Sequence, residues 1–335
     1  MSRIAILCPG RGSYTEKSLG ALPAEHPWVA RAEELRAGYG LEPLAALDRA
    51  PRFAAARHLK PSNVSALIYL VTMLDGAAAA AEQELVAVAG NSMGWYTALA
   101  LAGALSFEDG FRLVQEMAIL QEEAGQEEAG RGGQVIYPVV GEDWKRSREL
   151  ADLVRGALAL HPGEVFPSIH LGGYEVLAGS PDGVTRLLKE LPQVQIGKQT
   201  YPLRLAQHGP YHTPLVREVS LRARERLVDL AFQRPRAALV DGRGVRFSPF
   251  SADPATLRDY TLGAQVDTPY DFTASVRVIL HEVAPDLLVL PGPGNTLGGV
   301  CGQILCGLGW RGLRSRSDFE AAQAGERPIV HSLRR

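Results

Sequence analysis

The sequence predicts an α/β protein with a central parallel sheet and a smaller α+β unit inserted into it. Residues 85–90 form a short, fully apolar run rich in β-branched residues, which is typical of a central parallel strand, and a helical pattern follows from residue 95. Residues 135–205 then alternate between strand and helix patterns. Such an alternation within a short stretch indicates a separate small unit.

The composition sets limits on the class of protein. The 335 residues suffice for one large domain with an insertion or for two domains. A formal net charge of −2 gives no general attraction to nucleic acid or to an anionic membrane. No uncharged apolar run reaches the length of about 18 residues that a membrane span needs. We therefore expect neither nucleic acid nor a membrane as a partner.

The N-terminal segment and the cysteines point to the cytoplasm. Residues 1–9 are apolar but short, and Gly10 follows, which favours a buried first strand over a signal peptide. Cys8, Cys301 and Cys306 lack metal-ligand spacing, and an odd number argues against a disulfide framework. We expect reduced core cysteines in a cytoplasmic protein.

The elements follow in chain order from apolar periodicity and turn residues. Strands are predicted over residues 4–9 and 85–90, helices over 28–39, 64–80, 95–104 and 107–125, and an exposed joint over 125–133. The small unit has predicted strands over 135–140, 175–178 and 195–205 and helices over 145–158 and 182–191. The rest of the chain has predicted helices over 215–231 and 273–281, strands over 238–240 and 286–290, and a final helix after residue 294. The segment 311–335 is a basic, weakly patterned tail. The predicted units are residues 1–132 with 207–335, and residues 133–206.

The pentapeptide at residues 90–94, Gly-Asn-Ser-Met-Gly, has the Gly-x-Ser-x-Gly pattern of a nucleophile elbow. It lies between an apolar strand and a helix, as such an elbow requires, because only glycines leave room beside so tight a turn. The turn holds Ser92 clear of the sheet and places the amide of Met93 at a helix N-terminus, where an oxyanion would form. The simpler alternative is a serine that only caps the helix.

A serine nucleophile needs a base, because a free hydroxyl reacts poorly at neutral pH. Of the eight histidines, His208 and His212 lie together in a loop just before an amphipathic helix, where catalytic groups are common. The residues alone do not decide between these two.

Five segments stand in a characteristic order: Pro-Gly-Arg-Gly-Ser at 9–13, Gly-Asn-Ser-Met-Gly at 90–94, Tyr-His-Thr-Pro-Leu at 211–215, Thr-Pro-Tyr-Asp-Phe at 268–272, and Gly-Pro-Gly at 292–294. They resemble the motifs of the malonyl-CoA:acyl-carrier-protein transacylase family, which includes the acyltransferase domains of polyketide synthases. The resemblance covers nearly the whole chain. It implies an α/β-hydrolase-like large subdomain and a ferredoxin-like small subdomain.

The resemblance also implies the roles of individual residues. Ser92 would be the nucleophile and His212 the base, oriented by the backbone carbonyl of Asp271. The backbone amides of Arg11 and Met93 would form the oxyanion hole. No metal or bound cofactor is implied. The substrate would be an acyl-CoA or an acyl-phosphopantetheine thioester, the partner an acyl carrier protein and the enzyme a monomer, in fatty-acid or polyketide biosynthesis.

The departures from the family bear on the acyl group. Met117 stands where malonyl-using members have an arginine that binds the malonyl carboxylate in a bidentate contact. Burying an unpaired carboxylate is costly, whereas methionine offers an adaptable apolar wall. Asn91, Trp95 and Tyr211 are expected beside Met117 at the substrate.

Several functions therefore stay open. The enzyme transfers an uncharged acyl group, or it transfers malonyl with Arg11 in place of the missing arginine. A hydrolase would pass the same acyl-serine to water and clear stalled carrier proteins. A non-catalytic binding module is the weakest alternative, because the elbow is intact. An acidic carrier protein is expected to meet a basic face. Three clusters are candidates: Arg217, Arg222, Arg224 and Arg226; Lys145, Arg146 and Arg148; and Arg311, Arg314 and Arg316.

Overall fold

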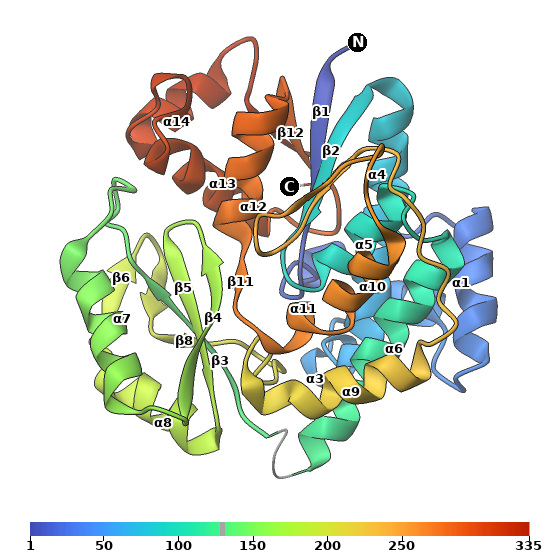
Figure 1. The fold of residues 1–335 in the computed structure, drawn as a ribbon, viewed down its shortest axis with the longest axis horizontal. Helices are drawn as coiled ribbons and strands as arrows, with labels where there is room; N and C mark the ends of the chain where they lie inside the picture. The colour runs from blue at the N-terminus through green and yellow to red at the C-terminus, as the bar shows by residue number, and fades with distance from the viewer. Residues whose placement is uncertain (128–130, 335) are drawn as a thin grey trace.

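The computed structural model describes residues 1–127 and 131–334 and contains two sheets (Figure 1). The larger sheet has the strand order β10-β9-β2-β1-β12-β13. Its strands are β1 (Arg3–Cys8), β2 (Glu84–Gly90), β9 (Ala238–Val240), β10 (Arg246–Phe247), β12 (Leu287–Leu290) and β13 (Val330–Ser332). All its pairings are parallel except that of the edge strand β10 with β9. The predicted α/β fold with a central parallel sheet is confirmed.

Helices cover both faces of this sheet. Figure 1 shows α4 (Pro61–Glu82), α5 (Gly94–Leu101) and α6 (Phe107–Gln126) on one side and α12 (Phe272–Val278) and α13 (Thr296–Gly307) on the other. The remaining helices of this unit are α1 (Pro27–Ala37), α2 (Leu44–Asp48), α3 (Ala55–His58), α9 (Arg217–Arg226), α10 (Pro254–Thr261), α11 (Ala264–Asp267) and α14 (Arg316–Ala324). Short helical turns lie at η1 (Glu16–Ser18), η2 (Pro214–Val216), η3 (Ile279–Val283) and η4 (Trp310–Gly312).

The smaller sheet has the order β11-β4-β5-β3-β8 and its own apolar core. Its strands are β3 (Gly133–Pro138), β4 (Val165–Leu171), β5 (Tyr174–Gly179), β8 (Leu203–Arg204) and β11 (Tyr270–Asp271), and it carries α7 (Arg148–Leu160) and α8 (Pro181–Glu190). A separate hairpin joins β6 (Val194–Ile196) to β7 (Gln199–Tyr201). The edge strand β11 comes from the last third of the chain and pairs in parallel with β4. The sheet thus extends beyond residues 133–206, and the domain boundaries stay a prediction.

Three sequence predictions of local structure were wrong. β4 was missed because Pro167 interrupts its pattern, and the proline is accommodated at an irregularity in the pairing with β5. The strand predicted over residues 195–205 is a hairpin, since Gly197 turns the chain with a φ of 59°. The tail over 311–335 contains α14 and β13, and β13 is ordered by its distant partner β12.

The helix α4 is long and apolar enough to cross a membrane by length and composition. In the protein, however, 67% of its most apolar window is buried, and it packs against α6, α5 and the main sheet. Packing in the core therefore accounts for its apolar character.

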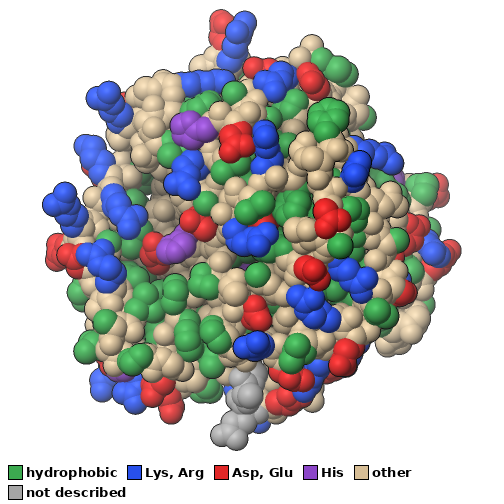
Figure 2. All heavy atoms as spheres, in the orientation of Figure 1, with side chains coloured by type: hydrophobic (Ala, Val, Ile, Leu, Met, Phe, Trp, Pro, Cys, Tyr) green, Lys and Arg blue, Asp and Glu red, His purple; other side chains and the backbone are tan. Residues whose placement is uncertain are grey.

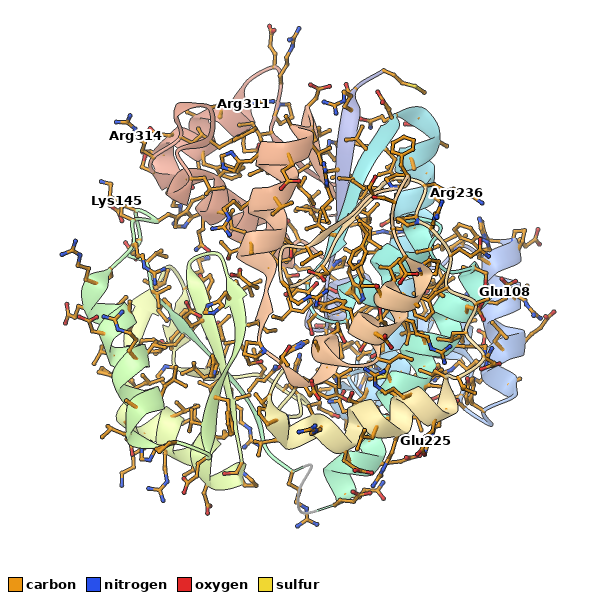
Figure 3. The ribbon with its side chains drawn as sticks, in the orientation of Figure 1. Glu108, Lys145, Glu225, Arg236, Arg311 and Arg314 are labelled. Atoms are coloured by element: carbon orange, nitrogen blue, oxygen red, sulfur yellow. The ribbon has the colours of Figure 1, made fainter. Side chains whose placement is uncertain are left out.

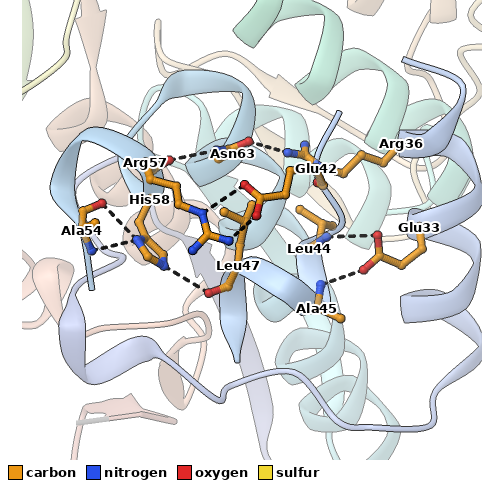
Figure 4. Close-up of polar contacts among 10 residues, drawn as sticks. All are labelled: Glu33, Arg36, Glu42, Leu44, Ala45, Leu47, Ala54, Arg57, His58 and Asn63. Atoms are coloured by element: carbon orange, nitrogen blue, oxygen red, sulfur yellow. Dashed lines mark hydrogen bonds and ion pairs between the residues drawn. The ribbon is translucent and has the colours of Figure 1, made fainter. Parts of the chain in front are cut away.

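A fully buried cation, Arg36, joins α1 to α4 and α6, and Figure 4 shows its contact with Asn63 of α4. The Arg36 guanidinium donates to the carbonyl oxygen of Ser62 at 2.7 Å and to the side-chain oxygen of Gln115 at 2.8 Å, and it also contacts Asn63. Burial without a directly bound carboxylate lowers the pKa of Arg36 to about 10. This network links α4 directly to α6.

Candidate active site

The strand β2 turns into α5 at a strained elbow. Ser92 has a φ of 54°, in the left-handed region that non-glycine residues rarely adopt. A Cβ atom on Gly90 would lie 2.1 Å from the carbonyl carbon of Gly94, and one on Gly94 would lie 2.3 Å from the carbonyl oxygen of Cys8. Both glycines are thus sterically required, as the pentapeptide predicts.

Ser92 and His212 form a hydrogen-bonded pair. The Ser92 Oγ lies 2.8 Å from the His212 Nε2, and the His212 Nδ1 lies 2.7 Å from the carbonyl oxygen of Gln265. A carbonyl oxygen can only accept, so Nδ1 carries the proton and Nε2 is left to accept from the serine hydroxyl. This is the arrangement that a serine nucleophile and its general base require.

The partner of His212 corrects one prediction. The carbonyl of Gln265, not that of Asp271, orients the imidazole. Asp271 lies in β11, and its side chain instead accepts from the Ala274 amide at 2.7 Å and caps α12. The side chain of Gln265 also donates to the Ser92 carbonyl at 3.1 Å and accepts from the Tyr96 hydroxyl at 2.6 Å. One glutamine therefore ties the base to the elbow.

Only one of the two candidate histidines reaches the serine. His208 bonds instead to the carbonyl oxygen of Ala206 at 2.8 Å. Burial, opposed by the hydrogen bond that Nδ1 donates to the Gln265 carbonyl, lowers the pKa of His212 to about 4. The imidazole is therefore neutral at pH 7 and able to accept a proton.

This pKa predicts the pH dependence of acylation. The rate should be independent of pH from about 8 down to about 5, because His212 stays neutral throughout this range. It should fall about tenfold per pH unit below about 4, where protonation removes the base. Single-turnover acylation with a thioester that is stable to acid would measure this profile. A loss of rate between pH 7 and pH 6 would contradict the lowered pKa.

The two residues whose backbone amides are predicted to form the oxyanion hole line the same small cavity. Met93 occupies the N-cap position of α5, and Met93 and Arg11 line one cavity with Ser92 and His212. Neither amide donates a hydrogen bond to another residue that the structure describes. Unpaired amides beside a nucleophile suit a developing oxyanion, and the oxyanion hole stays a prediction.

The cavity on Ser92 is small, with a volume of about 30 Å³. Met117 and Tyr211 line it, as predicted, together with Ser65 of α4 and Tyr96 of α5, which the sequence did not single out. Trp95 is fully buried elsewhere, where its Nε1 donates to the Thr261 hydroxyl at 2.9 Å, so its predicted role at the substrate is wrong.

A second, larger groove of about 320 Å³ also reaches Ser92. It runs between the two sheets, with Ile136 and Ile169 of the small sheet on one side and Leu297 of α13 on the other. Asn91 lines this groove and not the small cavity. The nucleophile thus stands where a narrow pocket meets a wider apolar passage.

Each of the three basic clusters contains side chains that pair with carboxylates. Lys145 pairs with Asp143 at 3.2 Å, and Arg316 pairs with Glu320 at 2.7 Å. In α9, Arg222 pairs with Glu127 at 2.7 Å, Arg226 with Glu123 at 2.6 Å and Arg224 with Asp259 at 3.2 Å. The other two clusters come together, because the Arg316 amide donates to the Asp143 carbonyl at 3.0 Å. Figure 3 shows Lys145, Arg311 and Arg314 on this edge, and Figure 2 shows several basic side chains exposed there. The docking face itself stays a prediction.

No family model matches the chain. A malonyl CoA-acyl carrier protein transacylase of Salmonella typhimurium is 27% identical over 312 residues, which are 91% of this chain and 94% of that protein. The polyketide biosynthesis protein ThaF of Burkholderia thailandensis is 32% identical over 220 residues, 65% of this chain but 17% of that protein. A malonyl-transacylase solved with its type II polyketide synthase acyl-carrier protein has a TM-score of 0.74 at 20% identity, covering 100% of this chain and 96% of that one. The structural likeness confirms the fold.

Proposed function

Since the chain is a homologue of the malonyl-CoA–acyl carrier protein transacylases, we propose that it moves an acyl group from a thioester, through an ester on Ser92, to the phosphopantetheine thiol of an acyl carrier protein. The donor is an acyl-CoA or an acyl carrier protein, and the pathway makes fatty acids or polyketides. The observation that carries the proposal is the 2.8 Å contact between Ser92 and His212.

The pair supports a two-step reaction. The Ser92 Oγ attacks the thioester carbonyl while the His212 Nε2 takes the hydroxyl proton, and the amides of Arg11 and Met93 stabilise the oxyanion. The intermediate collapses with cleavage of the C–S bond, and His212 returns the proton to the leaving thiolate. The acceptor thiol then attacks the ester, gives its proton to His212 and receives the acyl group, and the proton returns to Ser92. Ping-pong kinetics follow from the covalent intermediate.

The acyl group that we propose is uncharged. At position 117, a methionine and not an arginine lines the cavity of about 30 Å³ beside Ser92. A malonyl carboxylate placed against this wall would lose the bidentate partner that compensates its burial. Neutral acyl groups avoid this cost.

One observation favours malonyl transfer as a second candidate. Arg11 lines the same cavity, and among the described residues its side chain donates a single hydrogen bond, to the Gln207 carbonyl at 3.4 Å. It forms no ion pair with a carboxylate in the part of the chain that the structure describes. A guanidinium without an acidic partner could meet a malonyl carboxylate, so Arg11→Gln would remove malonyl labelling if this candidate holds.

Intact-mass spectrometry after incubation with a panel of acyl-CoAs and acyl carrier proteins tests the proposal. We expect a mass increase on Ser92 with neutral acyl donors and little with malonyl-CoA. Decay of the adduct only in the presence of carrier protein would support the transferase. Equal decay without an acceptor would instead assign the protein as a hydrolase.

Substituting Met117→Arg should raise the rate of Ser92 labelling by malonyl-CoA about tenfold or more, because it restores a cation beside the carboxylate. Labelling by acetyl-CoA should fall as the apolar wall is lost. The matched control, Met117→Leu, changes the shape of the side chain without adding charge and should leave malonyl use low. An unchanged malonyl rate in Met117→Arg would show that this wall does not govern acyl choice.

A further inference from the structure

We propose that Tyr270 is a positioning residue for the transfer reaction, because its hydroxyl group holds the backbone of the nucleophile elbow in place. This inference rests on the proposed function and adds a residue to its machinery. Tyr270 lies in β11, 180 residues away from Gly90 of the elbow in the sequence.

The Tyr270 side chain bonds directly to the elbow. It is buried, and its hydroxyl donates to the Gly90 carbonyl at 2.5 Å. Gly90 is the last residue of β2 and the first of the pentapeptide that contains Ser92. Burial raises the pKa of Tyr270 well above its ordinary value, so the phenol stays protonated and able to donate. In such surroundings a hydrogen bond is stronger than in water, and its loss is correspondingly costly.

The elbow needs contacts of this kind. Ser92 has a φ of 54°, and a non-glycine residue stays in this region only when the surrounding structure holds it there. The Gln265 side chain holds the chain after this residue, because it donates to the Ser92 carbonyl. Tyr270 holds the chain before it, through the Gly90 carbonyl. The two bonds thus restrain the backbone on either side of the strained residue.

The same tyrosine packs beside the base. The centres of the Tyr270 and His212 rings are 5.3 Å apart, and the ring planes make an angle of 55°. The backbone of Gly242 packs against the Tyr270 ring so closely that it leaves no room for a Cβ atom. The ring therefore fills space beside His212, whereas the hydroxyl acts on the elbow.

The strand that carries Tyr270 is fixed by both units of the protein. Tyr270 pairs with Ile169 in β4 of the small sheet. The amide of the next residue, Asp271, donates to the carbonyl of Gly242, between β9 and β10 of the larger sheet, at 2.6 Å. A side chain presented from an element held in this way keeps its position, which a positioning role requires.

Tyr270→Phe tests the proposal, because it removes the hydroxyl and keeps the ring. We expect the limiting rate of single-turnover Ser92 acylation to fall about tenfold, since a small displacement of a reacting group suffices for such a loss. The donor concentration that gives half of this rate should change less than about twofold, because the hydroxyl binds the elbow and not the substrate. An unchanged limiting rate would overturn the proposal.

The pH profile separates the hydroxyl from the ring. Phenylalanine keeps an aromatic ring beside His212, so the acidic limb of the profile should keep its midpoint near pH 4 in Tyr270→Phe. A midpoint that moves together with the rate would assign the loss to a change around the base, and it would overturn the role of the hydroxyl.

Tyr137→Phe is the matched control. It removes a buried hydroxyl that also donates to a backbone carbonyl, that of Pro192 in the small unit, at 2.9 Å. Both variants should lower the midpoint of thermal unfolding by about 2 °C, and only Tyr270→Phe should slow acylation. Equal slowing by the two variants would show that lost stability explains the rate, which would contradict a positioning role.

Hydrogen exchange of residues 90–94 tests the same contact without any substrate. The Asn91 amide donates to the Cys8 carbonyl at 2.9 Å, so its exchange reports the opening of the elbow. This exchange should be several-fold faster in Tyr270→Phe than in the unsubstituted protein, and it should be unchanged in Tyr137→Phe. Unchanged exchange in Tyr270→Phe would show that the hydroxyl does not hold the elbow and would overturn the proposal.

The proposed function and the role of Tyr270 fail by different results. If no thioester labels Ser92 in the unsubstituted protein, the proposed transferase fails, and the exchange experiment still decides whether Tyr270 holds the elbow. If thioesters label Ser92 and Tyr270→Phe reacts at the full rate, the transferase stands and the positioning role is wrong, even where exchange becomes faster.

Discussion

Substituting Ser92→Ala is expected to abolish acyl-enzyme formation. The hydroxyl of Ser92 is the group that the elbow holds against His212, at 2.8 Å. Alanine keeps a Cβ atom and the same backbone demand at a φ of 54°, so the elbow should persist while the nucleophile is lost. Intact-mass spectrometry with the best acyl donor would show no adduct, and transfer to carrier protein would fall to background.

Ser65→Ala is the matched control for this loss. Ser65 lines the same cavity from α4 but forms no hydrogen bond with His212 in the structure, so the variant should still form an ester on Ser92. Unfolding curves of both variants would establish that each is folded. An adduct that persists in Ser92→Ala, mapped to any other side chain, would refute the assignment of the nucleophile.

Substituting His212→Ala should slow acylation by about two to four orders of magnitude, which is the usual contribution of a positioned general base. The Ser92 hydroxyl would lose the imidazole that accepts its proton, although the amides of the oxyanion site would remain. Single-turnover rates at several pH values would measure the effect. The variant should also lose the acidic limb of the pH profile, because that limb reports the protonation of His212.

His208→Ala is the corresponding control, four residues away in the same loop. Its imidazole bonds to the Ala206 carbonyl and not to Ser92, so acylation should change much less than in His212→Ala. If His208→Ala were the more damaging change, His208 and not His212 would be the base.

The sequence could predict those parts of the site that depend on a local pattern. The Gly-x-Ser-x-Gly turn between a strand and a helix is such a pattern, and the structure has Ser92 at this turn. Gln265 left no such signal, because it orients His212 through a backbone carbonyl, which every residue type possesses. The predicted role of Trp95 at the substrate was wrong because a position close to Ser92 in the sequence does not determine on which face of α5 a side chain lies. The Trp95 side chain lies on a buried face and packs against Tyr260.

The fold shows the same division between local and distant determinants. The strand β2 and its helix α5 follow from a few consecutive residues. The strands β11 and β13 have two and three residues, too few for a periodicity, and each exists because a strand far away in the sequence pairs with it. Short edge strands of this kind are determined by tertiary structure and leave little trace in the sequence.

The pairing of β11 with β4 matters for anyone who would engineer this protein by exchanging its small unit with that of a relative. A graft cut at residues 133 and 206 would import four strands of the five-stranded sheet and leave the fifth to the recipient. Tyr270 in that strand pairs with Ile169 and also donates its hydroxyl to the Gly90 carbonyl at 2.5 Å. A chimaera in which β11 does not pair well with the imported β4 would thus disturb the nucleophile from a distance. A compatible chimaera needs residues 270–271 transplanted with the insert.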